Sequence, residues 1–140
     1  MKLEKNFKLS EFTYSPTAVK HNIPNTPSKL VVARLKLLCE QILQPLRESV
    51  LKPIKISSGY RCLKVNEMVG GVPSSQHTLG QAADIVINGM TPYEIGKKVI
   101  ELNLPFDQLI FYPTFVHISY SPRHRRQILY NKSYRGKRIS

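Results

Sequence analysis

One long helical pattern constrains the first half of the chain more than any other feature. Apolar residues recur there at steps of three and four: Leu30, Val31, Leu35, Leu38, Ile42 and Leu46. This spacing predicts a helix of about 20 residues from near Ser28 to near Val50. Pro45 lies inside the segment and has no backbone N–H to donate, so we expect the helix to kink or divide near Gln44.

Shorter apolar segments after this helix predict a small sheet. They alternate or run apolar over the length of a strand and end at glycine, proline or asparagine. The expected strands are residues 53–58, 82–87, 108–112 and 114–120, and a second, N-capped helix is expected at 91–102. We therefore expect an α+β fold in a single domain, with a small antiparallel sheet flanked by helices.

Two segments contain too much proline or glycine for long regular elements. Residues 7–30 include Pro16, Pro24 and Pro27, which predicts an irregular segment with a short helix starting near Ser10. Residues 59–81 hold four glycines and one proline, which predicts a long loop. Loops longer than about 12 to 15 residues in a compact domain are usually either functional or disordered.

Length and composition exclude several classes of protein. A chain of 140 residues provides one core, and its 41% hydrophobic content argues against disorder. No window approaches the about 18 to 20 unbroken apolar residues of a membrane span, and the first residues lack an apolar run of signal-peptide length. We expect synthesis in the cytoplasm without a signal peptide. Cys39 and Cys62 are too few for a disulfide framework and are expected to be reduced residues of the interior.

The charge is strongly positive and unevenly distributed. The chain carries 21 Lys and Arg against 9 Asp and Glu, a formal charge of +12, which predicts an anionic partner. Seven basic residues and no acid follow residue 122, so we divide the chain into a domain at 1–122 and a basic C-terminal tail at 123–140. The tail shows no nucleic-acid recognition motif, so no specific nucleic-acid partner is expected.

Two histidines and one aspartate lie where the predicted strands meet the glycine-rich segment. His77 and Asp84 are seven positions apart on either side of Gly80, and His117 lies in the middle of the last predicted strand. Two imidazoles and a carboxylate are a ligand set for a catalytic zinc ion, which takes about three protein ligands and leaves the fourth position to water. A structural role for each histidine is the alternative that spacing alone leaves open.

Residues 75–84 match the pattern S-x-H-x-x-G-x-A-x-D, which resembles the metal motif of the zinc D-alanyl-D-alanine carboxypeptidase and L-alanyl-D-glutamate endopeptidase superfamily. The segments 56–61, 106–110 and 115–119 resemble other parts of that family, and the resemblance spans roughly residues 7–121. It implies a hedgehog/DD-peptidase-like fold, a zinc peptidase domain over residues 1–122, and zinc as the cofactor. The metal ligands that it implies are His77, Asp84 and His117.

The same resemblance implies roles for residues around the metal. Arg61 would enter the cleft and bind a substrate carbonyl or carboxylate, or stabilise developing charge, which suits a planar guanidinium. Ser75 would orient the loop or the substrate. Asn66 would bind substrate or support the site, and Ser119 would support it from the sheet.

The general base is the point at which the chain departs from the family pattern. Such peptidases need a carboxylate close to the attacking water, commonly a few residues before the last histidine. Here residues 111–116 contain no acid, and Tyr112 stands where relatives of the phage branch carry glutamate. Asp107 is the nearest candidate base. Tyr112 is expected to donate a hydrogen bond to an intermediate, and Glu67 is a third candidate.

These expectations lead to a zinc-dependent peptidase that cleaves peptide stems of bacterial peptidoglycan, either as a carboxypeptidase or as an endopeptidase. The alternative is a catalytically impaired, zinc-containing module that binds the cell wall or has a structural role. The resemblance implies an endolysin-like protein of phage or prophage origin that reaches the wall by another route than a signal peptide. The basic tail would then bind anionic wall polymers.

Overall fold

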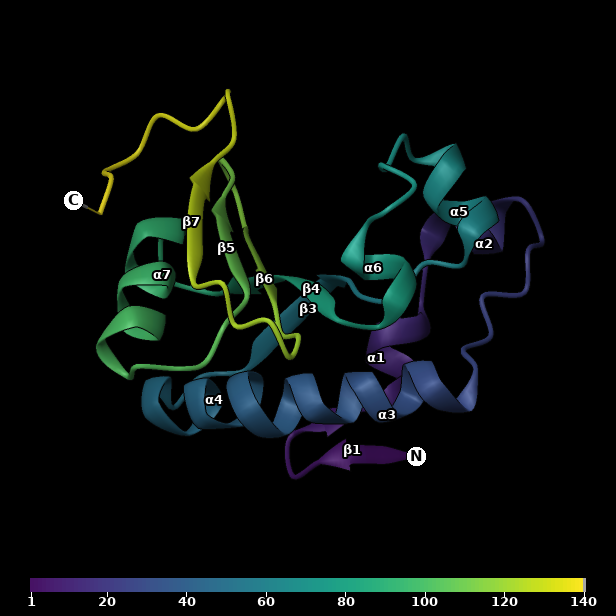
Figure 1. Ribbon diagram of the computed structural model, residues 1–140, viewed down its shortest axis with the longest axis horizontal. Coiled ribbons are helices and arrows are strands. Elements are labelled where there is room, and N and C mark those ends of the chain that lie inside the picture. Colours follow the sequence, from purple (N-terminus) through teal and green to yellow (C-terminus); the bar gives the residue numbers. More distant parts are fainter. Residues whose placement is uncertain (140) are drawn as a thin grey trace.

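A five-stranded sheet lies at the centre of the structure, a computed structural model that describes residues 1–139 (Figure 1). The order of its strands is β3-β4-β6-β5-β7. All neighbours pair antiparallel except β5 and β7, which run parallel. The strands are β3 (Ile54–Ser58), β4 (Ala82–Ile87), β5 (Gln108–Phe111), β6 (Val116–Ser119) and β7 (Gln127–Tyr130). The expected α+β class is confirmed, although the sheet is mixed rather than wholly antiparallel.

The long helix forms in three parts and runs along the lower side of the molecule in Figure 1. The parts are α3 (Lys29–Leu38), one π-helical turn, η1 (Cys39–Leu43), and α4 (Gln44–Val50). Ser28 caps the start, because its Oγ accepts a hydrogen bond from the Val31 N–H at 3.2 Å. The π-helical turn ends at Leu43, two residues before Pro45, which lacks the N–H that a regular turn would use. The helix is therefore continuous, with its irregularity at the predicted place.

The proline- and glycine-rich segments contain more regular structure than the sequence predicted. The N-terminal residues form a two-stranded hairpin, β1 (Lys2–Glu4) and β2 (Phe7–Lys8), followed by α1 (Leu9–Thr13) and α2 (Pro16–Lys20). The segment expected as a long loop contains α5 (Leu63–Met68) and α6 (Gln76–Leu79). These elements are too short to show a clear hydrophobic period, and contacts with the rest of the domain stabilise them.

The second long helix, α7 (Pro92–Glu101), begins with a capping box. The Thr91 N–H donates to Glu94 Oε1 at 2.8 Å, and the Glu94 N–H donates to Thr91 Oγ1 at 3.1 Å. This helix packs against β5 and β6, and Figure 1 shows it beside the sheet. None of the described helices is long and apolar enough to cross a membrane.

Side chains alternate between the two faces of the sheet, and this alternation separates the core from the cleft. On β4, Ala83, Ile85 and Ile87 are buried in the hydrophobic core, whereas Asp84 lies on the opposite face. On β6, Val116 and Ile118 belong to the core, and the intervening residue again faces away from it. The core also contains Cys39, whose thiol is free, as expected, and whose pKa is raised by burial.

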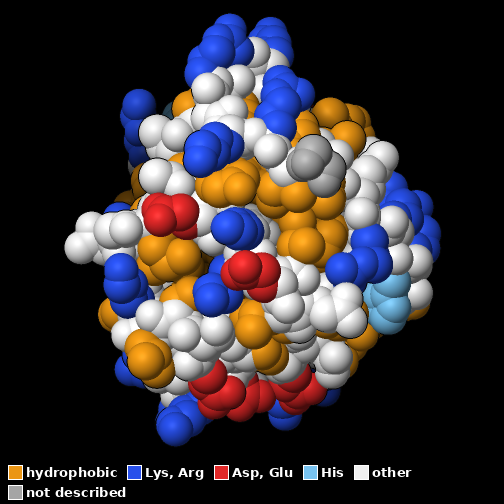
Figure 2. Space-filling model, turned by 90° about the vertical axis from the view of Figure 1, so that its left-hand side faces the viewer, with side chains coloured by type: hydrophobic (Ala, Val, Ile, Leu, Met, Phe, Trp, Pro, Cys, Tyr) orange, Lys and Arg blue, Asp and Glu red, His pale blue; other side chains and the backbone are white. Residues whose placement is uncertain are grey.

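The C-terminal residues add the edge strand β7 to the sheet. β7 pairs with β5 along its length, from Gln108 opposite Gln127 to Phe111 opposite Tyr130. Tyr134 is buried, with its ring 5.6 Å from the rings of both Phe111 and Tyr130. Figure 2 views this side of the molecule and shows Lys and Arg side chains around an area of apolar ones. The region grouped as a basic tail is thus anchored to the sheet through its aromatic residues.

Replacing Tyr134 with alanine tests this anchoring. Because Tyr134 is 4% exposed and packs on Phe111, Tyr134→Ala should lower the free energy of unfolding by about 3 kcal/mol, as measured by urea denaturation. Tyr14→Ala is the matched control, since Tyr14 is 65% exposed, and should change it by less than about 0.5 kcal/mol. Equal stability of the two variants would contradict the anchored C-terminus.

Candidate metal centre

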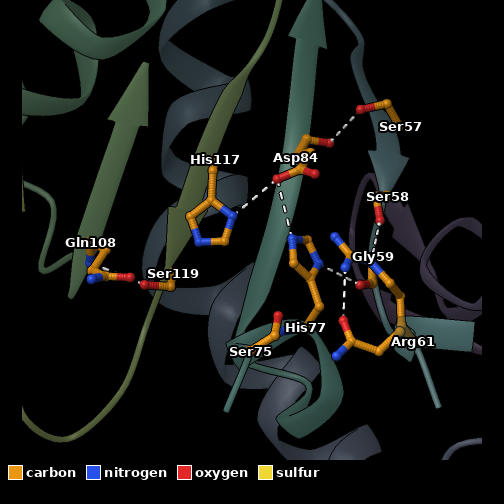
Figure 3. A network of polar contacts seen from close by, with 11 residues as sticks. Ser57, Ser58, Gly59, Arg61, Ser75, His77, Asp84, Gln108, His117 and Ser119 are labelled. Atoms are coloured by element: carbon orange, nitrogen blue, oxygen red, sulfur yellow. Dashed lines mark hydrogen bonds and ion pairs between the residues drawn. The ribbon is translucent and has the colours of Figure 1, made fainter. Parts of the chain in front are cut away.

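Strand register places Asp84 and His117 next to each other. Asp84 on β4 lies directly opposite His117 on β6, although the two residues are 33 positions apart in the sequence. Both side chains project from the same face of the sheet, and His117 Nδ1 lies 3.0 Å from Asp84 Oδ1 (Figure 3). Directly opposite residues of an antiparallel pair are close enough for their side chains to meet. The sheet therefore supplies two of the three predicted ligands.

The short helix α6 supplies the third predicted ligand. Ser75 caps this helix, since its Oγ accepts a hydrogen bond from the His77 N–H at 3.2 Å. Gly80 ends the helix with a φ of 77°, a left-handed conformation that favours glycine. A Cβ at this position would also lie 2.8 Å from the backbone oxygen of Val31. The chain can therefore reverse into β4, which brings His77 Nε2 to 3.2 Å from Asp84 Oδ1.

The hydrogen bonds of these residues fit a metal ligand set. His77 Nδ1 lies 2.7 Å from the carbonyl oxygen of Gly59, which can only accept, so Nδ1 carries a proton and the Nε2 lone pair faces Asp84. Ligand atoms of His77, Asp84 and His117 lie within 4.8 Å of one another. Two imidazole nitrogens and a carboxylate oxygen thus converge on one small volume. Such a set could hold a metal ion, and zinc fits its donor types.

Burial and hydrogen bonding hold these groups in the ionisation states that metal binding needs. Burial by itself raises the pKa of Asp84, but its contacts with His117 and His77 outweigh burial and hold this pKa well below its ordinary value. Burial lowers the pKa of His117, with Asp84 opposing the shift. A charged carboxylate and a neutral imidazole are therefore favoured at neutral pH. These are the forms that bind metal ions.

The three residues lie in a cleft of about 920 Å³. One wall comes from the turn between α1 and α2 together with α5 and the loop that follows it, and these residues carry no charge. The opposite wall comes from β5, the β5–β6 turn and the β6–β7 loop, and it includes Gln108, Tyr112, Arg123 and Arg125. The cleft is large enough for several residues of a peptide.

Comparison with known protein families decides the assignment. A model of the Peptidase M15 family matches residues 5–119, which include His77, Asp84 and His117. The chain belongs to the Peptidase M15 family. None of the curated proteins compared with it matches the chain. The matched part of this M15 chain contains both strands and the short helix of the candidate centre, and it ends before β7.

In this M15 protein, Arg61 lines the cleft and is held from two sides. Its Nε donates to Ser58 Oγ at 3.2 Å (Figure 3). Its Nη1 donates to Asn66 Oδ1 at 2.9 Å. Asn66 is buried and donates in turn to the carbonyl oxygen of Val72 at 2.8 Å. A Cβ at Gly71 would lie 2.0 Å from Asn66 Oδ1, so this position needs glycine. Asn66, which does not line the cleft, thus holds the Arg61 guanidinium, and Ser75 caps the helix that carries His77.

The M15 cleft brings Tyr112 to the same face as the candidate ligands. Its ring stacks on Phe115, with ring centroids 4.4 Å apart. Burial raises the pKa of the Tyr112 hydroxyl, as does the nearby charge of Asp84, whereas Arg61 lowers it. The hydroxyl is therefore protonated at neutral pH and can donate a hydrogen bond but not accept a proton as a base. Ser119, expected as a supporting residue, is fully buried and accepts a hydrogen bond from the Gln108 N–H at 3.0 Å.

The structure places Asp107 in an ion pair and not in the lining of the M15 cleft. Its Oδ1 accepts hydrogen bonds from the backbone N–H and Nε of Arg125, and its Oδ2 accepts from Arg125 Nη2 and from Gln76 Nε2, each at 2.9 Å. The carboxylate is fully buried, and these hydrogen bonds, chiefly those from Arg125, hold its pKa well below the ordinary value. A carboxylate with all these partners is a poor proton acceptor, so the contacts favour a structural role over the expected general base.

Within residues 1–139, the cleft lining contains no second carboxylate. Glu67, the third candidate base, is exposed on α5 and does not line the cleft. Among residues 1–139, Asp84 is the one acid that lines it, and Asp84 belongs to the candidate metal centre. Sequence reasoning predicted the three residues that the structure brings together, and it noted the absence of an acid in residues 111–116. It missed the arginines of the β6–β7 loop, because their place in the cleft depends on β7.

Replacing Asp107 with asparagine tests its structural role. Because three hydrogen bonds from Arg125 to a charged carboxylate would be weakened, Asp107→Asn should lower the free energy of unfolding at pH 7 by about 2 kcal/mol. The folded-state pKa of Asp107 is depressed, so the stability that it contributes is present above its unfolded pKa of about 4 and is lost as the pH falls below that value.

Urea denaturation of both proteins between pH 7 and pH 2.5 measures the difference. We expect a full difference above about pH 5 that narrows below about pH 4, since asparagine does not titrate. Glu101→Gln is the control, because Glu101 is exposed and its contact with Lys98 is 3.8 Å long. A difference for Asp107→Asn that does not change with pH would contradict the ion pair.

Proposed function

We propose that this M15 protein is a zinc-dependent peptidase that cleaves peptide stems of bacterial peptidoglycan. One observation carries the proposal: His77 Nε2 and His117 Nδ1 both lie within 3.2 Å of Asp84 Oδ1, in a cleft large enough for a peptide. Membership of the Peptidase M15 family supports the reaction class and the type of substrate. Carboxypeptidase and endopeptidase action would use the same ligand set, and both stay open.

Each residue of the centre has a role in this proposal. His77, Asp84 and His117 would hold the zinc ion, and Gly59 would keep His77 in the required tautomer through its carbonyl oxygen. When bound, zinc supplies Lewis acidity, which polarises the scissile carbonyl group and makes water a stronger nucleophile. Arg61, held by Ser58 and Asn66, would donate hydrogen bonds to the substrate carbonyl oxygen as negative charge develops on it.

Proton transfer is the step for which the cleft is least equipped. Tyr112 can donate a hydrogen bond to the reacting carbonyl group, but its raised pKa keeps it from acting as a base. The lowered pKa of Asp84 makes it an equally poor base. The proton of the attacking water would therefore pass to solvent in the open cleft. General acid–base catalysis contributes about 10²- to 10⁴-fold to the rate of such enzymes, so we propose slow turnover.

The lack of a carboxylate base in the described part of the cleft favours a second candidate function. A module that keeps the metal centre without a carboxylate base would bind peptidoglycan or play a structural role with no cleavage. For either function, we propose an endolysin-like protein of phage or prophage origin that acts at the bacterial cell wall. The basic residues after residue 122 would bind anionic wall polymers, a proposal that their charge and exposure support.

Mass spectrometry of defined peptidoglycan stem fragments tests the proposed function. Zinc-loaded protein should shorten the stem at one peptide bond, and the fragment masses identify that bond. His117→Ala should lose both the activity and stoichiometric zinc, measured by elemental analysis, because it removes one of three ligands. His21→Ala is the matched control, since His21 is exposed and lies outside the cleft, and should behave like the wild type. Stoichiometric zinc and wall binding without any cleavage would support the second candidate and overturn the first.

Introducing a carboxylate at position 112 tests the proposed cause of slow turnover. Tyr112→Glu places an acid in the cleft beside the candidate centre and should raise kcat about 100-fold if a missing base limits the rate. Tyr112→Phe, which removes only the hydroxyl group, should lower kcat several-fold through the loss of one hydrogen bond. A Tyr112→Glu protein that folds, binds zinc and cleaves no faster than the wild type would contradict this explanation.

A further inference from the structure

The loop between β6 and β7 adds an unpaired positive charge to the cleft. Arg123 and Arg125 of this loop both line the cleft, on the side formed by β5. The charge of Arg125 is matched by Asp107, with Nη2 and Oδ2 2.9 Å apart. Arg123 is exposed, and within residues 1–139 its guanidinium has neither a hydrogen-bond nor an ion-pair partner. Of the two arginines, Arg123 is therefore the one available to a ligand.

The loop is held in one conformation around Arg123. Asp107 accepts from the backbone and the side chain of Arg125, and Arg126 donates to the carbonyl oxygen of Leu104 at 2.7 Å. The Arg126 guanidinium also lies 4.8 Å from the ring centroid of Phe106. His124 and Arg126 have φ angles of 40° and 52°, a left-handed conformation that costs roughly 1 kcal/mol or more per residue without glycine. The contacts of Arg125 and Arg126 offset this cost and hold the loop in that conformation.

The charge balance of the cleft favours an anionic ligand. Arg61 and Arg123 both lack a carboxylate partner among the described residues, and the single acid of the cleft, Asp84, already contacts two histidines. The opposite wall, from the α1–α2 turn and the segment around α5, is uncharged. Two guanidinium groups are therefore available to an anionic ligand: Arg61, held by Asn66 of α5, and Arg123, on the β5 side. The proposed function already assigns Arg61 to the reacting carbonyl group, which leaves Arg123 for a peptide carboxylate. A guanidinium suits this task because its fork of N–H donors matches a carboxylate.

We propose that Arg123 is a specificity-determining residue that binds a carboxylate of an acidic peptide on the β5 side of the candidate metal centre. Asp107, by holding Arg125 and with it the loop, is the positioning residue for this contact. The proposal rests on the proposed function in one respect, namely that a peptide occupies the cleft. It adds the charge of that peptide and its direction: the carboxylate-bearing part lies toward Arg123 and the uncharged part toward the α1–α2 turn.

Two forms of one peptide test the contact. The first is a peptidoglycan stem peptide with free carboxylates, and the second is the same peptide with its carboxylates converted to carboxamides, each labelled with a fluorophore at its amino terminus. Fluorescence anisotropy gives Kd for both peptides with metal-free and with zinc-loaded protein. Arg123→Ala should weaken binding of the acidic peptide about tenfold and leave binding of the amide unchanged. Arg123→Lys should restore part of the loss, because lysine keeps the charge but not the fork.

Control variants separate a local contact from the overall field of a basic protein. Arg135→Ala removes one positive charge from an exposed arginine that does not line the cleft, and it should leave both Kd values unchanged. Thermal unfolding should be the same for Arg123→Ala and the wild type, since the Arg123 side chain is exposed. The proposal is overturned if Arg123→Ala binds the acidic peptide as tightly as the wild type does. It is equally overturned if Arg135→Ala weakens binding by the same factor.

This experiment distinguishes the inference from the proposed function. Binding to metal-free protein requires no hydrolysis, so an Arg123-dependent preference for the acidic peptide in a protein that cleaves nothing supports the carboxylate site and overturns only the peptidase. Cleavage of stem peptides with a KM that Arg123→Ala leaves unchanged supports the peptidase and overturns the carboxylate site. A raised KM for the acidic substrate at an unchanged kcat supports both.

Discussion

The candidate centre depends on the register between β4 and β6. In this register Asp84 lies opposite His117, while Ala83 and Ile85 face the hydrophobic core. A slip of one residue would turn the apolar side chains toward water and Asp84 into the core. The strand would then lose the free energy gained by burying several apolar side chains. Burial of the apolar side chains therefore enforces the register, and the register holds the two ligands together. The core thus supports the site although it lies on the other face of the sheet.

A second constraint is the distribution of charge around the cleft. At the candidate centre, the Asp84 carboxylate contacts two imidazoles. The other buried carboxylate, that of Asp107, forms an ion pair with Arg125. A buried carboxylate without such partners would be strongly destabilised, so each acid near the cleft is fully engaged. In the described part of the chain, this arrangement leaves the cleft basic and without a free carboxylate. The same contacts that stabilise the fold thereby limit the proton chemistry that the site can perform.

The local parts of the fold were readable from the sequence. The apolar period from Leu30 to Leu46, with proline at its irregular point, predicted the long helix. Short alternating or apolar segments predicted β3 through β6. These signals are strong because each element buries one face. β7 was missed and its residues were grouped as a basic tail, since arginine and lysine dominate the composition there. Its place in the sheet comes from pairing with β5 and from the burial of Tyr134 on Phe111, which are long-range contacts.

The sequence by itself determined the family and predicted the candidate ligands. His77, Gly80 and Asp84 lie on one short helix, the turn that ends it and the strand that follows. Their spacing is therefore local in sequence, and a sequence motif can identify it. Only the tertiary structure decided what Asp107 contacts and which arginines enter the cleft. Arg125 reaches Asp107 because the chain returns to the sheet edge through β7, a contact that no residue spacing encodes. Whether an acidic or basic side chain forms an ion pair or faces the cleft depends on its neighbours in space. Neighbours that are distant in sequence are determined by the tertiary structure.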